Sequence, residues 1–239
     1  MRIALLTAGG SGNRMGQDIP KQFMCIDNKP VIIYTLQAFQ FSQDVDAIAV
    51  VCLHGWNIVL QAYANQYNIT KLKWIFEGSD SNQASIRNGI FGLKEVGCKD
   101  EDIVLVHDGV RPLVSSDIIS KNIEVCEKYG YAVTGLMCKE AIMECVDKNV
   151  HEIDIPRERL VRTQTPHTYK LGTLLKAHTQ ADQQQISNTV ASCTLLAKLG
   201  VKEQYLVQGS EKNGLKLTKP EDVELFKALI HTDPESWMK

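Results

Sequence analysis

Short apolar runs alternate with amphipathic stretches through the first half of the chain, and this alternation limits the possible folds more than any other feature. Runs typical of buried strands occupy residues 3–6, 47–53, 73–76, 103–107 and 132–136. Helical periodicity fills the stretches between them, at 31–39, 58–67, 82–95 and 116–129. Repeated strand–helix–strand units build a mostly parallel sheet with helices on both faces. We therefore predict an α/β fold.

The second half of the chain departs from this alternation. Residues 138–162 resemble two short strands around an Asp147-Lys-Asn149 turn. Such a hairpin is barely stable alone, so it must pack on something, and an arm reaching a second subunit is one solution. Further helices are predicted at 172–180, at 187–198 and from Pro220 onward, and strands at 204–207 and 215–217. Because we find no linker, repeat or low-complexity tract, residues 1–239 are predicted to form one domain with an arm inserted at about 138–162.

The first predicted strand runs directly into a glycine-rich loop. Gly9, Gly10, Gly12 and Gly16 follow it, and such a loop can turn its backbone N–H groups toward phosphate. Two cations, Arg14 and Lys21, come next. The loop therefore predicts a triphosphate site, since a ligand-free turn would leave the paired cations unexplained.

Two common phosphate-binding motifs do not fit this loop. A dinucleotide fingerprint starting at Gly10 requires glycine where the chain has Met15, and no acidic residue follows at the expected distance. A P-loop requires Gly-Lys-Ser/Thr, but Gln17-Asp18 follows Gly16. The first mismatch disfavours an NAD-binding oxidoreductase.

Ligands of such sheets bind beyond the carboxyl ends of the strands, where several charged residues are expected. Asp108 ends the strand at 103–107 and suits Mg²⁺ bridging nucleotide phosphates, although a turn aspartate is an equal alternative. Arg111 could hold an anion. Lys216 stands between two leucines, which predicts that it faces the crevice rather than solvent.

Two further segments admit both a binding role and a solvated one. Gly78 and Ser85 flank small polar residues before a helix, which suits a base or ribose pocket or a plain turn. A cluster of arginines at 157, 159 and 162 suits a second anion, or is merely solvated.

Taken together, five ordered motifs resemble those of the polyol-phosphate cytidylyltransferases, the family acting on ribitol 5-phosphate and 2-C-methyl-D-erythritol 4-phosphate. They are A-G-G-S-G-N-R-M-G with P-K-Q at 8–22, G-x-x-x-x-x-x-S at 78–85, H-D-G-V-R-P at 107–112, Q-T-P at 164–166, and L-K-L-T-K-P-E-D at 215–222. The resemblance covers almost the whole chain. It implies a Rossmann-like nucleotidyltransferase domain, a β-arm that swaps between the subunits of a homodimer, Mg²⁺, and the reaction of CTP with a polyol phosphate to give a CDP-polyol and pyrophosphate.

The resemblance also implies a role for each matching residue. Catalysis falls to three cations, Arg14, Lys21 and Lys216, and metal binding to Asp108. The implied nucleotide contacts are Ala8, Gly9, Gly10, Gly12, Gly78 and Ser85. The implied acceptor contacts are Arg111, Arg157, Thr165 and Ser187, with Arg157 contributed by the partner subunit.

Two departures from the family pattern bear on the acceptor. Relatives usually carry arginine where this chain has Asn82, and Thr-Asp where it has Ser187-Asn188. These changes leave open an inactive relative that only binds nucleotide. Val110 and the His54-Gly-Trp56 segment resemble the ribitol 5-phosphate branch, which implies teichoic acid or capsule precursor synthesis. The alternative acceptor, 2-C-methyl-D-erythritol 4-phosphate, implies isoprenoid synthesis.

Composition narrows the partners further. A net charge of −2 gives no general attraction to nucleic acid or to an anionic membrane. The apolar runs are far shorter than the ~20 residues of a membrane span, and the N-terminus lacks the pattern of a signal peptide. We therefore expect a cytoplasmic protein.

Overall fold

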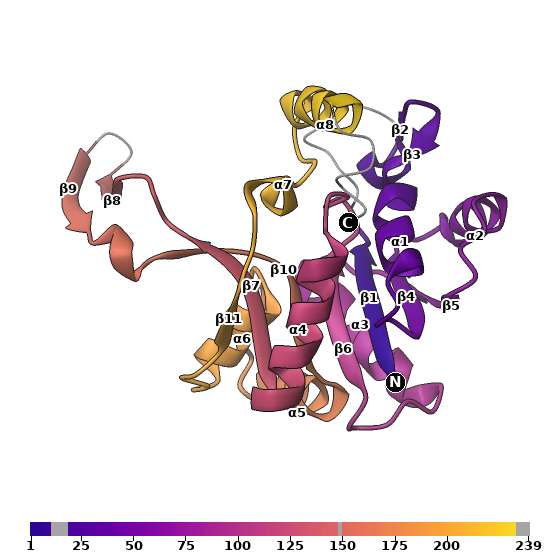
Figure 1. Ribbon diagram of the computed structural model, residues 1–239. Coiled ribbons are helices and arrows are strands. Elements are labelled where there is room, and N and C mark those ends of the chain that lie inside the picture. Colours follow the sequence, from indigo (N-terminus) through magenta and orange to yellow (C-terminus); the bar gives the residue numbers. More distant parts are fainter. Residues whose placement is uncertain (11–18, 148–149, 233–239) are drawn as a thin grey trace.

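A twisted seven-stranded sheet forms the centre of the protein (Figure 1). The computed structural model describes residues 1–10, 19–147 and 150–232. The strand order is β11-β7-β10-β6-β1-β4-β5. The bounds of these strands are β1 Arg2–Ala8, β4 Ala47–Cys52, β5 Leu72–Glu77, β6 Ile103–Asp108, β7 Tyr131–Met137, β10 Val161–Lys170 and β11 Tyr205–Gln208. Only β10 runs antiparallel to its neighbours, so the predicted mostly parallel sheet is confirmed.

Helices cover both faces of the sheet, as predicted. On one face lie α1 (Val31–Phe41), α2 (Asn57–Gln66) and α4 (Ser116–Tyr129). On the other lie α3 (Asn82–Glu95), α5 (Leu171–Gln183) and α6 (Ser192–Lys198). Side chains alternate along β1, so Ala4 and Leu6 join the first core while Ile3 and Leu5 join the second. Every residue of β4 is buried, as is typical of a parallel strand covered on both faces.

Local sequence fixes the ends of α4 where they were expected. Ser115 accepts a hydrogen bond from the backbone N–H of Ile118 at 3.3 Å, which caps the first turn. Gly130 ends the helix with a φ of 86°, a left-handed conformation that glycine adopts without strain. α4 therefore begins shortly after the carboxyl end of β6 and ends directly before β7.

The order of the strands reverses at β1: β4 and β5 follow on one side of it, and β6 lies on the other. β4 pairs with one side of β1 and β6 with the other, and Thr7 lies opposite Asp108. The carboxyl ends of β1 and β6 therefore meet at the point where α/β sheets open a crevice for ligands.

A third apolar cluster lies next to this crevice, and its residue Val110 follows the carboxyl end of β6. It joins β2 (Cys25–Ile26), which pairs with β3 (Lys29–Pro30), and the start of α1 to the C-terminal helix α8 (Pro220–Thr232). Tyr34 and Phe226 meet edge to face at 5.0 Å between ring centroids. The N–H of Leu217 donates to the carbonyl of Val110 at 2.9 Å, which ties the segment before α8 to the loop after β6.

An antiparallel hairpin projects away from the sheet (Figure 1). Its strands are β8 (Ile142–Asp147) and β9 (Val150–Ile155), followed by the short helix η3 (Arg157–Arg159). The hairpin lies within the predicted arm, and its two stems, β7 and β10, are neighbours in the sheet. Within the described ranges no helix is long and apolar enough to cross a membrane.

Three secondary-structure predictions were wrong. β10 was not expected, because Pro166 and its polar flanks hide a central strand. The helix predicted at 187–198 begins only at Ser192, since the preceding residues are bound to α3. The segment 215–217 is extended but forms no strand; it follows the short helix α7 (Glu211–Gly214).

Candidate active site

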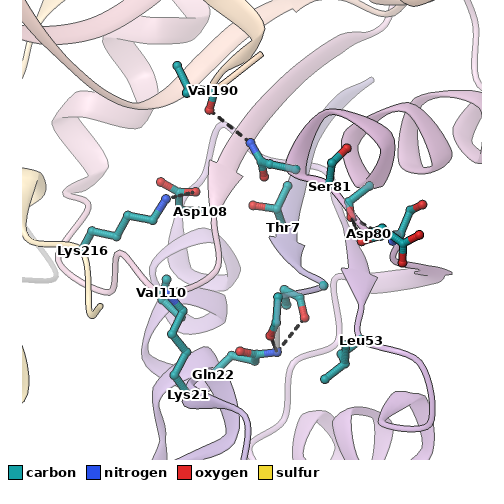
Figure 2. A pocket seen from close by; sticks show the side chains of 16 residues that line it. Thr7, Lys21, Gln22, Leu53, Asp80, Ser81, Asp108, Val110, Val190 and Lys216 are labelled. Carbon is teal, nitrogen blue, oxygen red and sulfur yellow. Dashed lines mark hydrogen bonds and ion pairs between the residues drawn. The ribbon is translucent and has the colours of Figure 1, made fainter. Parts of the chain in front are cut away.

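Two adjoining cavities open at the carboxyl end of the sheet. The larger has a volume of about 600 Å³ and the smaller about 160 Å³. Residues lining both are Thr7, Asn82, Asp108, Val190 and Lys216. In Figure 2 Lys216 reaches from the C-terminal segment to Asp108 at the end of β6. The boundary between the cavities is therefore charged.

The opening loop forms one wall of the larger cavity. Ala8, Gly9 and Gly10 line it, together with Lys21 of the short helix η2 (Lys21–Phe23). Gln22, which is buried, donates from Nε2 to the carbonyl oxygens of Ala8 at 2.8 Å and Gly10 at 3.0 Å. This clamp fixes the loop relative to Lys21. Gln22 belongs to the P-K-Q motif, but the sequence alone predicts no role for it.

Two predicted residues, Gly12 and Arg14, lie outside the described residues.

The loop after β5 packs directly behind the opening loop. A Cβ on Gly78 would lie 2.9 Å from Cα of Gly9 and 3.0 Å from the carbonyl oxygen of Cys52, so only glycine fits there without a shift. Ser85 lines the larger cavity, and its Oγ accepts from the N–H of Ser79 at 2.9 Å. Gly78 thus brings the two loops together, while Ser85 reaches the cavity surface.

Asp108 is held by two cations. Arg111 donates from Nε to one carboxylate oxygen at 2.8 Å, and Lys216 donates from Nζ to the other at 3.0 Å. Burial alone would raise the pKa of Asp108, but Lys216 and Arg111 outweigh it and hold the pKa well below its usual range. The Asp108 N–H donates to Thr165 Oγ1 at 3.2 Å. Two cations against one carboxylate leave this group with a net positive charge that suits phosphate.

The smaller cavity lies between β6, β10 and the start of α6. Arg111 and Thr165, both predicted acceptor contacts, line it. Gln164 is fixed by donating from Nε2 to the Ser210 carbonyl at 2.9 Å and accepting from Asn213 Nδ2 at 2.8 Å. The segment around β10 is therefore anchored to the C-terminal part of the chain.

The loop before α6 is bound to the N-terminal turn of α3. Gln83 Oε1 accepts from the N–H and Oγ1 of Thr189, each at 2.9 Å, and Asn82 Nδ2 donates to the Val190 carbonyl at 3.3 Å. These contacts place Val190 at the mouth of both cavities. Ser187 is exposed and lines neither cavity, and Asn188 has a φ of 59°.

Two arginines lie away from the cavities. Arg87 pairs with Asp182 at 2.8 Å and lies over the Phe91 ring, so it supplies no cation in place of the one missing at Asn82. Arg157, at the base of the arm, donates from Nη1 to the Lys139 carbonyl at 2.9 Å and lines neither cavity.

The residues present are compatible with a divalent cation held mainly by substrate. Among the described residues no group of three or more candidate ligands comes together. Mg²⁺, however, is often bound by one carboxylate with substrate phosphates and water, and each oxygen of Asp108 keeps a second lone pair beyond the bonds to Arg111 and Lys216. Asp108 therefore stays the predicted metal ligand.

The chain matches the family described as 2-C-methyl-D-erythritol 4-phosphate cytidylyltransferase (IspD) over residues 2–232. It belongs to this family. Ribitol-5-phosphate cytidylyltransferase of Lacticaseibacillus paracasei is 39% identical over 232 residues, covering 96% of this chain and 98% of that protein. The 2-C-methyl-D-erythritol 4-phosphate cytidylyltransferase of Clostridium acetobutylicum is 35% identical over 231 residues, covering 96% and 97%.

A solved structure has the same fold. The crystal structure of the Francisella tularensis 2-C-methyl-D-erythritol 4-phosphate cytidylyltransferase superposes with a TM-score of 0.79 at 25% identity, covering 95% of this chain and 99% of that one. The predicted Rossmann-like nucleotidyltransferase fold and the predicted family are thereby confirmed.

Proposed function

We propose that this protein transfers the cytidylyl group of CTP to ribitol 5-phosphate, giving CDP-ribitol and pyrophosphate. The observation that carries the proposal is the pair of adjoining cavities, joined at Lys216 and Asp108, in a chain of the cytidylyltransferase family. A volume of about 600 Å³ suits a nucleotide, and the smaller cavity suits part of a second substrate. The chain is 39% identical to a ribitol-5-phosphate cytidylyltransferase and 35% identical to a 2-C-methyl-D-erythritol 4-phosphate cytidylyltransferase. This difference supports the choice of ribitol 5-phosphate as the acceptor.

The larger cavity is the proposed nucleotide site. Ala8, Gly9 and Gly10 line it, and the backbone N–H groups of such a loop can donate to phosphate. Gly12 is assigned the same role from its motif. Ser85 and the close approach at Gly78 complete the proposed contacts to cytidine.

The smaller cavity is the proposed acceptor site. Arg111 and Thr165 line it and would hold the acceptor beside the nucleotide. Arg157, exposed at the base of the arm, is proposed to reach the acceptor site of the other subunit, because it lines no cavity of its own. Ser187 would contribute only by a movement of its exposed loop.

The proposed chemistry is an in-line displacement at the α-phosphorus of CTP. An oxygen of the acceptor phosphate forms the new P–O bond while the bond to the bridging oxygen of pyrophosphate breaks, and pyrophosphate leaves with that electron pair. No general base is required, because the phosphate nucleophile is already ionised at neutral pH. Burial lowers the pKa of His107 and His167 to about 4, so both rings are neutral near pH 7.

Cations supply the proposed rate enhancement. Lys21 and Lys216 line the larger cavity, where they would neutralise the charge that develops on the α-phosphate and the departing pyrophosphate; Arg14 is assigned the same role from its motif. Mg²⁺, held by Asp108 and the triphosphate, would neutralise phosphate charge when bound.

We also propose a homodimer formed through the hairpin of β8 and β9. The hairpin projects from the sheet, and a two-stranded hairpin is marginally stable alone. Sedimentation of the full chain, compared with a variant whose hairpin is replaced by a short turn, tests this. A wild-type monomer would contradict the proposal.

Pyrophosphate release tests the function. The protein is incubated with CTP and Mg²⁺ and with the phosphates of ribitol, 2-C-methylerythritol, glycerol, xylitol and arabinitol in turn. We expect the highest kcat/KM with ribitol 5-phosphate, which would connect the protein to teichoic acid or capsule precursors. Preference for 2-C-methyl-D-erythritol 4-phosphate would instead indicate isoprenoid synthesis. No release with any acceptor would refute the enzyme and favour a nucleotide-binding relative.

A further inference from the structure

Three residues that line the smaller cavity each carry a buried polar atom with no hydrogen-bond partner. One is His107, whose ring packs edge to face against Phe39 in the core on the opposite face of the sheet. Two such atoms remain. They are Nε2 of His167 and Oγ of Ser192, on residues that are each 2% exposed. Both residues line the cavity of about 160 Å³. An unsatisfied buried polar group costs about 1–3 kcal/mol, so such groups are normally paired with protein, water or ligand. Their presence in one cavity points to a polar occupant.

The hydrogen bond on the other side of the His167 ring determines what Nε2 can do. A hydrogen bond to the backbone of Gln164 raises the pKa of His167, so it comes from a ring N–H; because Nε2 has no partner, we assign this N–H to Nδ1. Burial lowers the pKa of His167 to about 4, which keeps the ring neutral. Nε2 therefore presents a lone pair and can accept a hydrogen bond but not donate one.

The strand register places the His167 side chain on the face of the sheet that α3, α5 and α6 cover. His167 pairs with Val106 across the sheet, and Val106 belongs to the core that packs α3, α5 and α6. Ser192 is the first residue of α6. Its hydroxyl can both donate and accept. One wall of the cavity thus offers an acceptor, and the facing element offers a hydroxyl.

The two ends of the cavity differ in charge. Arg111 and Lys216 stand with Asp108 at the end shared with the larger cavity. A phosphate is attracted there and repelled by the lone pair of a neutral histidine. A neutral hydroxyl, in contrast, can donate to His167 and exchange hydrogen bonds with Ser192.

We propose that His167 and Ser192 recognise the hydroxyl groups of the acceptor's polyol chain, and so determine which polyol phosphate is accepted. The phosphate of the acceptor lies at the Arg111 and Lys216 end, and its carbon chain extends between β10 and α6. This inference rests on the proposed function. It adds two specificity-determining residues that no motif singled out.

The experiment compares His167→Leu and Ser192→Ala with wild type. His178→Leu is the matched control, because His178 is also buried and its ring nitrogens also lack partners, but it lies in α5 and lines neither cavity. Pyrophosphate release is measured with CTP and the best acceptor, and with analogues of that acceptor that each lack one hydroxyl. Thermal melting shows whether each variant is folded.

We expect His167→Leu to lower kcat/KM for the full acceptor about tenfold, with KM for CTP within about twofold of wild type. With the analogue lacking the contacted hydroxyl, His167→Leu and wild type should be equally active. Ser192→Ala should show the same equality with one of the analogues. A loss that is uniform over all acceptors, or no greater than that of His178→Leu, would overturn the inference. If His167→Leu does not fold, Ser192→Ala alone decides in the same way.

The inference and the proposed function fail differently. If wild type turns over a polyol phosphate but the variants show no hydroxyl dependence, only the inference is overturned. If wild type releases no pyrophosphate, calorimetric titration with ribitol 5-phosphate decides: weaker binding to His167→Leu than to His178→Leu supports the inference, and equal binding or none to wild type overturns it.

Discussion

Replacing Asp108 with asparagine keeps the size of the side chain and removes the charge that faces two cations. In the folded protein Asp108 and Arg111 are 13% and 12% exposed, and their charged atoms lie 2.8 Å apart. Lys216, on the other carboxylate oxygen at 3.0 Å, is 38% exposed. The Asp108→Asn variant therefore leaves one largely buried guanidinium without its counterion.

The two ion pairs contribute unequally to the expected loss. Removing one partner of a buried pair typically costs about 3–5 kcal/mol. Asparagine can still accept one hydrogen bond from Arg111, so the lower end applies. The pair with Lys216 is screened by solvent and adds no more than about 1 kcal/mol. We expect the free energy of unfolding to fall by about 3 kcal/mol.

Urea unfolding followed by tryptophan fluorescence at pH 7 measures this loss. Asp182→Asn is the matched control, because Asp182 pairs with Arg87 at the same 2.8 Å but the two side chains are 50% and 40% exposed. The control should lose less than about 1 kcal/mol. Equal losses in the two variants would refute the reasoning from burial.

The difference in the free energy of unfolding between wild type and Asp108→Asn should depend on pH with a definite sign. The folded pKa of Asp108 lies below the value of about 3.9 for an unfolded aspartate, so its stabilisation is complete above that unfolded value. It is lost only as the pH falls through the folded pKa. The difference in the free energy of unfolding between wild type and Asp108→Asn should therefore be constant between about pH 5 and about pH 8. It should shrink only below about pH 4. A gap that narrows near neutrality would contradict this assignment.

Three further predictions test other parts of the structure. Lys21→Ala should lower kcat by about 10²–10³ while leaving the melting temperature nearly unchanged, and near-normal turnover would show that the opening loop is misassigned. Gly78→Ala should lose about 1–3 kcal/mol in urea unfolding, because its Cβ would meet backbone atoms, whereas Gly10→Ala, with nothing within 4 Å, should lose less; the reverse order would contradict the packing. Burial lowers the pKa of His178 to about 4, so its stabilisation is complete above the unfolded value of about 6.5 and is lost as the pH falls toward 4. His178→Leu should reduce the slope of unfolding free energy between about pH 6 and pH 5 by up to about 1.4 kcal/mol per unit, and an unchanged slope would contradict a neutral buried ring.

The parallel part of the fold was predictable because its signals are local. The helices at 82–95 and 116–129 have their predicted bounds, since Ser81 and Ser115 cap their N-termini. β10 was missed because its place in the sheet is fixed by neighbours distant in sequence, β6 and β7, rather than by its own alternation. The same cause explains the overlong helix before Ser192, whose preceding loop is held by contacts to Gln83.

Motifs located much of the candidate site, and tertiary contacts supply the rest. Lys21, Asp108 and Lys216 meet around one cavity although Lys216 is far from the others along the chain. The clamp made by Gln22 and the unpaired atoms of His167 and Ser192 were not predicted, because a buried polar residue has a role only through the atoms that surround it. Arg157 stays a prediction, since its proposed contact lies in another subunit.

Different but overlapping parts of the chain line the two cavities. Apart from Val190 and Lys216, the larger is built by residues numbered 110 or lower, whereas β10 and the start of α6 contribute the distinctive wall of the smaller. The first half also contributes Ile86, Val106, His107 and Arg111 to the smaller cavity, so both halves of the chain build it. Under the proposed function, chimeras that exchange the part after the arm between relatives are expected to change the acceptor preference, because that part supplies β10 and the start of α6, while the nucleotide donor stays the same. Recombination within the family could in this way diversify products without rebuilding the donor site.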